Sequence, residues 1–338
     1  MPSVLTHYGF NKEVLNNNIQ FLKGNEDIYL LGAQGPDPFF FCGIVPFITG
    51  SKNSKEIRKF GNKLHKMDPG KVFEYFFKYS DEKEEKDILY AYILGAGLHY
   101  VLDRKIHPYV FYKTGFSDDP KQKKKYFANH TLFETHLDVL LMNGRYSQYK
   151  TTSIESIKCD EDKIEEVSEM YEKMAKEILN ETFIDDDSFE DSYDDMLLIE
   201  KLLYSKKGVK KGIVNVLFKK TPFNTMMHPL TVKDDKTVDY LNVKKNKWKD
   251  PATEVEFDKN FDELLDEAKL EANEWINLVN ERYKGNSINL EEFTKSFIYD
   301  GYVEGNKMKV FDSVYKKEEG KKWLLVQLVK DTLMDTKN

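Results

Sequence analysis

The stretch ILYAYILGAGLHYVLDRKIHPY, residues 88–109, decides the fold class of this chain. Its apolar residues predict a helix over residues 86–106 that is apolar nearly all round. Such a helix lies in the middle of a helical bundle, where Gly95 and Gly97 permit close approach by its neighbours. Its most apolar part has 15 residues and contains a histidine. Because a bilayer needs about 20 apolar residues, we expect no transmembrane segment.

Helical patterns also dominate the rest of the chain. Residues 258–285 form an amphipathic pattern that ends at Gly285, and residues 127–142 form another that ends before Gly144. A further helix begins at Asn289, with Glu292 placed as in a capping box. Strand alternation is absent, apart from an ambiguous stretch at residues 302–315. The sequence therefore predicts an all-α fold.

Composition and charge restrict the class of protein. The formal net charge is -7, from 51 Lys and Arg against 58 Asp and Glu, so no stable nucleic-acid partner is expected on a wide basic face. The only cysteines, Cys42 and Cys159, make no disulfide framework, which fits a reducing compartment. The N-terminal sequence lacks the basic and apolar regions of a secretory signal. We therefore expect a cytoplasmic protein.

The region between residues 180 and 250 differs in charge. FIDDDSFEDSYDD, residues 183–195, is interpreted as a solvated loop or helix edge, because the spaced ligands and glycine of a calcium-binding EF-hand loop are missing. SKKGVKKGIVNVLFKK, residues 205–220, is interpreted as an exposed helix with snorkelling lysines. Peripheral contact of this basic stretch with a membrane is the alternative.

Two helices carry the same pair of ligand types. His99 and Asp103 are four residues apart, as are His130 and Glu134, so each pair leaves one face of its helix. His107 lies one further turn beyond Asp103 if the helix persists. Each pair alone is compatible with a buried salt bridge, but two pairs on apolar helices favour a metal site. Zinc accepts both ligand types and takes about four ligands.

Three further residues extend this set. His7 lies near the N-terminus, Asp37 lies in LGAQGPDPFFF, residues 31–41, and His65 lies in FGNKLHKMDPG, residues 60–70. Taken singly, either histidine fits an ordinary core or surface position, and Asp37 fits a turn cap. Their number favours a shared metal site.

The order and types of these residues resemble the zinc-dependent phospholipase C family of bacteria and its structural cousins, the single-strand-specific nucleases of fungi and plants. The resemblance is closest to the cytosolic branch of the phospholipase-like family and is carried by four strings, THYGFNKEVL, GAQGPDPFFF, HYVLDRKIHPY and HTLFETHLD. It covers residues 1–145 strongly and the remainder loosely, through WKDP and the following helix. It implies one multi-helix domain over 1–338, with a metal-site half at 1–145, a variable insertion at 146–250 and C-terminal helices at 251–338.

The resemblance also implies a trinuclear zinc site, although two ions are an alternative. It assigns a first zinc to Asp37, His65, His99 and Asp103, and a second to His107, His130 and Glu134. His7 would join a third ion, shared through Asp103 as a bridging carboxylate. The interval between Asp103 and His107 is shorter than in the secreted relatives. The division of ligands at His107 therefore stays open.

The secreted relatives hold their third ion partly with the amine and carbonyl of an N-terminal tryptophan. This chain begins Met-Pro instead, and removal of Met1 would expose the amine of Pro2. We hypothesise that the Pro2 amine replaces the missing ligand.

Such a site predicts the chemistry of the protein. Three zinc ions among five neutral histidines and three carboxylates would leave a charge of about +3, which suits a phosphate-bearing substrate. We predict a zinc-dependent phosphoric ester hydrolase, a phospholipase C-like phosphodiesterase acting on a phospholipid head group or a small phosphodiester through a metal-activated water. Asp37 would orient that water or accept its proton, and Asp138 would orient a histidine.

Two other functions remain open from the sequence. A zinc-dependent nuclease or nucleotide phosphodiesterase would use the same metal chemistry. A metal-stabilised binding module would have closed four-ligand sites and no catalysis. The sequence contains no H-E-x-x-H, P-loop or G-x-S-x-G motif, so the enzyme classes that carry those motifs have no support.

Overall fold

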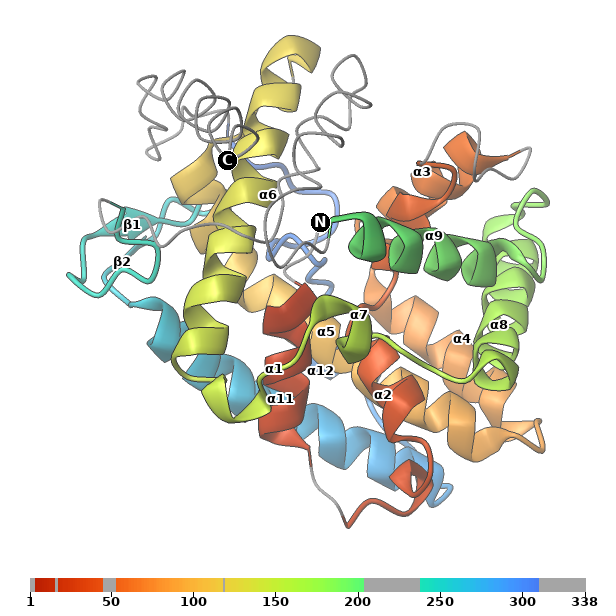
Figure 1. The fold of residues 1–338 in the computed structure, drawn as a ribbon. Helices are drawn as coiled ribbons and strands as arrows, with labels where there is room; N and C mark the ends of the chain where they lie inside the picture. The colour runs from red at the N-terminus through yellow and green to blue at the C-terminus, as the bar shows by residue number, and fades with distance from the viewer. Residues whose placement is uncertain (1–3, 16–17, 45–52, 118, 204–237, 310–338) are drawn as a thin grey trace, which may run out of the picture.

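The structure is a computed structural model that describes residues 4–15, 18–44, 53–117, 119–203 and 238–309 (Figure 1). Most of these residues are helical, which confirms the predicted all-α fold. The α-helices are α1 (Val4–Val14), α2 (Glu26–Gly32), α3 (Ser54–Leu64), α4 (Pro69–Asp81), α5 (Lys86–Thr114), α6 (Pro120–Asn143), α7 (Ser153–Ser156), α8 (Glu161–Leu179), α9 (Ser188–Leu203), α11 (Phe261–Tyr283) and α12 (Leu290–Thr294). Three short 3-10 helices are η1 (Gln20–Leu22), η2 (Asp37–Phe41) and η3 (Ser147–Tyr149).

Helix α5 lies at the centre of the bundle, as its apolar sequence predicts. Every residue from Leu89 to Asp103 is buried, and α5 packs against α1, α2, α4, α6, α8 and α11. The glycines are required by this packing: a Cβ added at Gly97 would lie 2.0 Å from the Trp275 ring on α11. One added at Gly95 would lie 2.1 Å from the carbonyl oxygen of Tyr29 on α2.

Helix α5 continues beyond the predicted end at residue 106 and contains Pro108 in its interior. An internal proline costs about 3 kcal/mol because it removes a hydrogen bond and crowds the preceding turn. The buried side chains of Ile106, Tyr109 and Val110 extend the apolar packing past this point and offset that cost. The helix ends at Thr114 and is followed by Gly115, which has a φ of 86°. The residues on either side of Arg104 and Lys105 therefore stay in one helical register.

The other predicted helices are present with shifted boundaries. Helix α6 begins at Pro120, before the predicted start at residue 127, and ends at Asn143 as predicted from Gly144. Helix α11 lies within the predicted range 258–285, and a capping box of Asn260 and Glu263 begins it. The Asn289 side chain accepts a hydrogen bond from the Glu292 N–H at the start of α12.

Some elements differ from the prediction. Two-residue strands β1 (Trp248–Lys249) and β2 (Glu256–Phe257) pair antiparallel, and they are too short for their alternation to be recognised in the sequence. In the stretch 302–315, the described part contributes an isolated bridge between Phe297 and Val303, and residues 310–315 lie outside the described residues. Among the helices of the described residues, none combines the length and the apolar composition of a membrane span.

The acidic stretch 183–195 is a loop followed by the start of helix α9. Its exposed acids confirm the interpretation as a solvated loop or helix edge; they are Asp185, Asp186, Asp187, Asp191 and Asp194. Helix α9 buries Phe189, Tyr193 and Met196 against η2 and α8. These apolar side chains recur at helical spacing among acidic residues. The acidic composition of this stretch, on which its interpretation rests, does not by itself predict the amphipathic helix. The basic stretch 205–220 lies outside the described residues.

Candidate metal centre

Histidines and carboxylates from five elements gather in the middle of the bundle. Within each of three groups, one ligand atom per residue lies within 4.8 Å of the others, and every member is buried. The groups are His7 with His99 and Asp103, Asp37 with His65 and His99, and His107 with His130 and Glu134. All eight side-chain ligands expected from the sequence are therefore brought together.

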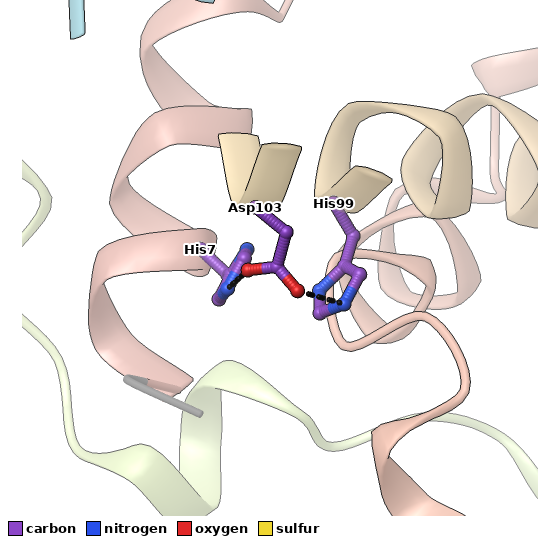
Figure 2. Close-up of side chains that lie close together, drawn as sticks. All are labelled: His7, His99 and Asp103. Carbon is purple, nitrogen blue, oxygen red and sulfur yellow. Dashed lines mark ion pairs between the residues drawn. The ribbon is translucent and has the colours of Figure 1, made fainter. Parts of the chain in front are cut away.

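Asp103 occupies the centre of this arrangement (Figure 2). Its Oδ1 lies 3.1 Å from His7 Nε2, contributed by α1, and its Oδ2 lies 3.2 Å from His99 Nε2, one turn earlier on α5. Oδ1 is also 3.8 Å from His107 Nε2. Asp103 thus uses its two oxygens toward different histidines, which is the arrangement a bridging carboxylate needs.

Asp37 and His65 form a group together with His99. Asp37 Oδ1 lies 3.0 Å from His65 Nε2, and these residues stand at the start of η2 and at the end of α3. The loop before η2 passes directly over the His99 ring at Gly35, which has a φ of 50°. A Cβ there would lie 2.6 Å from that ring, so the Gly-rich loop is what allows Asp37 to reach the cluster.

His107 joins the group contributed by α6. Its Nε2 lies 3.6 Å from Glu134 Oε1, and His130 Nε2 lies 3.0 Å from the same oxygen. Since α5 remains helical through residue 107, this histidine stands between Asp103 and Glu134. The short interval after Asp103 therefore does not remove His107 from the second group.

Backbone carbonyls fix the orientation of three histidine rings. The Nδ1 atoms of His65, His99 and His107 lie 2.8, 3.0 and 2.8 Å from the carbonyl oxygens of Gly61, Ala33 and Tyr299, respectively. A carbonyl only accepts, so each Nδ1 donates its proton, and in the neutral ring Nε2 keeps its lone pair. These lone pairs face carboxylate oxygens, which also only accept. A cation between them would resolve this conflict, as in metal sites whose histidines are oriented by carbonyls.

Neighbouring histidines lower the pKa of two carboxylates of the cluster despite their burial. Burial opposes ionisation of Asp103, but the charges of His107 and His99 and the hydrogen bond to His7 hold its pKa well below the usual value. Burial likewise opposes ionisation of Glu134, yet His130 and His107 lower its pKa. When no metal ion is bound, a proton on His107 supplies the positive charge. Burial lowers the pKa of His107, but Asp103 and Glu134 raise it to about 10. Buried negative charge thus demands a positive partner.

Unpaired buried atoms point to the same requirement. His7 Nδ1, His99 Nε2 and Glu134 Oε2 are buried and make no hydrogen bond within the described residues. Buried polar atoms rarely stay unsatisfied. Imidazole nitrogens and carboxylate oxygens are the ligands that zinc takes together, so the residues present fit zinc ions.

An open cavity of about 370 Å³ adjoins the cluster. Members of all three groups lie on its wall, including Asp37, Asp103 and His107. Aromatic side chains form another part of the lining: Phe40, Phe111, Phe116, Tyr126 and Phe127. Basic side chains, Arg58, Lys66 and Lys123, line it as well. The ligand cluster is therefore accessible to a small molecule.

Asp138 supports the cluster differently from the expectation that it orients a histidine. Its carboxylate accepts hydrogen bonds from the backbone of Leu5 and from both the N–H and hydroxyl of Thr6. His136, left out of the predicted site, stacks on Tyr240 with ring centroids 4.3 Å apart. Pro2 and His228 lie outside the described residues.

Sequence reasoning missed several groups at this site. The Tyr299 carbonyl that orients His107 acts through backbone, so its side-chain type gives no signal. Asp300 and the basic side chains Arg58 and Lys66 line the cavity only because distant segments meet there. Lys123 had a visible signal in the basic run KQKKK at residues 121–125.

Comparison with known proteins gives one match. The family model for zinc-dependent phospholipase C matches residues 6–185, more than half of the chain. That span includes every residue of the three ligand groups. No curated protein and no solved structure matches the chain.

Proposed function

The chain belongs to the zinc-dependent phospholipase C family, and on that premise we propose that it is a phosphodiesterase that releases a phosphorylated head group or splits a small phosphodiester. The observation that carries this proposal is the wall of the cavity, where three buried carboxylates and three imidazoles lie together: Asp37, Asp103 and Glu134 with His65, His107 and His130. This wall is open to a substrate, which a closed structural metal site would not be.

We propose that the three ligand groups hold two or three zinc ions, with Asp103 shared between neighbours. Bound zinc supplies Lewis-acid stabilisation of phosphoryl oxygens and makes water a nucleophile near neutral pH. The carbonyls of Ala33 and Tyr299 keep the rings of His99 and His107 in place, so the ligand geometry is organised before substrate arrives.

Asp37 is the residue we propose for proton transfer. It lies on the cavity wall beside His65. Burial raises the Asp37 pKa, but the hydrogen bond from His65 and the charges of His99 and His65 together lower it below its ordinary value. An ionised carboxylate at this position can orient the attacking water and accept its proton. Phe40, Phe111 and Phe116 hold the apolar part of the ester against the same wall and exclude water from it.

Nuclease or nucleotide phosphodiesterase activity is the second candidate. Aromatic side chains beside basic ones, such as Phe127 near Lys123, also suit a stacked base next to a phosphate. We propose that either reaction takes place in the cytoplasm, on inner-leaflet lipids or soluble phosphodiesters.

The test is a comparison of substrates with zinc-depleted and zinc-reloaded protein. Hydrolysis of a short-chain phospholipid supports the phospholipase assignment, and preferential hydrolysis of single-stranded DNA supports the nuclease. Asp103→Asn should abolish either activity while the protein remains folded by circular dichroism. If reloaded protein hydrolyses neither substrate nor a simple aryl phosphodiester, the catalytic assignment fails and the binding-module alternative gains support.

The Pro2 hypothesis has its own test. Intact-mass measurement on protein made in a cell shows whether Met1 has been removed, and elemental analysis of the same sample gives the zinc content. Retention of Met1 together with three bound zincs would show that the Pro2 amine is not a ligand.

A further inference from the structure

The lining of the cavity includes three basic side chains in an acidic protein, two of them exposed to solvent. Lys66 follows the ligand His65, Arg58 lies two turns earlier on α3, and Lys123 lies in the first turn of α6. Among the described lining residues, Asp300 is the one acid that belongs to none of the three ligand groups. We define the cavity rim as Arg58, Lys66 and Lys123. Once the three ligand carboxylates are assigned to the metal ions, these three positive charges stand against the single acid Asp300.

Lys66 and Lys123 of this rim differ from two lysines on the neighbouring helix α3. Lys59 and Lys63 pair with Glu56 and Glu181 at 2.9 and 2.6 Å. Lys66 and Lys123 are exposed and have no ion pair or side-chain hydrogen bond among the described residues. Arg58 donates to the Cys42 carbonyl rather than to a carboxylate. Charges without a counter-charge at the edge of a cleft attract ligands of opposite charge and repel ligands of like charge.

We propose that the cavity rim selects phosphodiesters that carry no ammonium group, which refines the proposed function and rests on it. A choline or ethanolamine head group would bring a positive charge toward Lys66 and Lys123. A glycerol or inositol head group, or a second nucleoside, leaves the ester with a net negative charge that these lysines attract. The chemistry shared by these substrates is an anionic phosphodiester, whether it comes from a lipid or from a nucleotide.

The aromatic lining alone would not make this choice. Phe40, Phe111 and Phe116 could accommodate a quaternary ammonium through cation–π contacts. Such contacts contribute about 0.5–1 kcal/mol at exposed sites, and here positive side chains stand beside the rings. Repulsion from the unpaired lysines opposes that contact, so the net preference is for an anionic substrate.

The experiment compares kcat/KM of zinc-loaded protein for soluble dihexanoyl phosphatidylglycerol and dihexanoyl phosphatidylcholine, both below their micellar concentrations. We expect the glycerol ester to be preferred about fivefold at low salt, as two exposed charge contacts would give, with less preference at high salt. The double variant Lys66→Gln/Lys123→Gln should lose most of this preference. The matched double variant Lys55→Gln/Lys59→Gln removes the same charge from α3 away from the cavity and should keep it.

A dinucleotide with a single phosphodiester forms a further arm and identifies the source of the anionic substrate. If nucleotides are the source, the dinucleotide should be hydrolysed, and its hydrolysis should fall in the Lys66→Gln/Lys123→Gln variant but not in the control variant. If lipids are the source, only the lipid should be hydrolysed. Preference for the choline ester, or equal loss of preference in both double variants, would overturn the proposal.

A binding measurement separates this inference from the proposed function. Calorimetry of zinc-loaded protein should show glycerol 3-phosphate binding about fivefold more tightly than phosphocholine, and the rim variant should lose that difference. If no substrate is hydrolysed, the proposed function fails while the calorimetry still decides the charge preference. If hydrolysis occurs but phosphocholine binds equally well or better, only the inference about the rim fails.

Discussion

Asp138 on α6 accepts two hydrogen bonds from Thr6 on α1, one from its backbone N–H at 2.8 Å and one from its hydroxyl at 2.6 Å. The first N–H groups of a helix have no partner within it, so this carboxylate caps α1 from a different helix. Thr6 immediately precedes His7, and Asp138 lies one turn beyond Glu134. The contact therefore joins the positions of ligands in separate groups.

Replacement of Asp138 should weaken the group that contains His7. We expect Asp138→Asn to cost about 1–3 kcal/mol of stability in metal-free protein, because one of the two acceptor oxygens becomes an NH2 group and leaves a donor of Leu5 or Thr6 without an acceptor. We expect zinc affinity to fall about tenfold or more, as it does when residues that orient ligands are changed. Denaturant unfolding and zinc titration measure the two effects. Thr135→Val on α6 is the control, because the Thr135 hydroxyl only bonds back to Thr131. Unchanged zinc affinity in Asp138→Asn would mean that the cap does not position His7.

Two buried histidines on α6 offer a matched test of the ligand assignment. His130 and His136 are each 7% exposed, but only His130 belongs to a ligand group. We expect His130→Gln to lose the zinc of its group, because His107 and Glu134 alone supply too few ligands. His136→Gln should keep the zinc content of the unmodified protein. Elemental analysis of both variants after zinc reloading measures this difference, and equal zinc loss from both would contradict the assignment.

Helical periodicity predicts five of the eight candidate ligands, because it places His99, Asp103 and His107 on one helix face and His130 and Glu134 on another. His7, Asp37 and His65 are predicted only from their number and from the resemblance to the family. The parts that could not be predicted depend on tertiary contacts. Continuation of α5 past Pro108 depends on apolar packing that only the folded bundle supplies. Likewise, Tyr299 orients His107 through its carbonyl from 192 residues away, and no local pattern records that contact.

Packing at the centre of the bundle predicts the cost of a small substitution. Gly97→Ala would place a Cβ 2.0 Å from Trp275, whose ring is fully buried and whose indole N–H donates to the Leu94 carbonyl. Overpacking of this kind costs about 1–3 kcal/mol. We expect chemical denaturation to show this decrease in the free energy of unfolding. The double variant Gly97→Ala/Trp275→Leu should regain the part of the loss that comes from overlap between the added methyl group and the Trp275 ring. If Gly97→Ala is as stable as the unmodified protein, α5 and α11 are not in this close contact.

The pairing of Arg104 with Glu271 predicts how stability depends on pH. Arg104 donates two hydrogen bonds to Glu271 at 3.0 and 2.7 Å, joining α5 to α11, and Lys105 also pairs with this carboxylate. Burial opposes ionisation of Glu271, but the charge of Arg104 and the hydrogen bond of Lys105 outweigh it and lower the Glu271 pKa. Because the pKa is lower in the folded state, this stabilisation is present above the ordinary glutamate value and disappears as pH falls through the folded value.

We therefore expect Glu271→Gln to lose roughly 2 kcal/mol at neutral pH, the size of hydrogen bonds to charged groups. The difference from the unmodified protein should shrink in acid, because protonated Glu271 then resembles glutamine. Urea unfolding of zinc-free protein across that pH range measures it. Glu274→Gln, on the same helix, is the control, because Glu274 is exposed and has no ion pair among the described residues. It should match the unmodified protein throughout. If the difference in the free energy of unfolding between Glu271→Gln and the unmodified protein stays constant down to acidic pH, the charge of Glu271 does not stabilise the contact between α5 and α11.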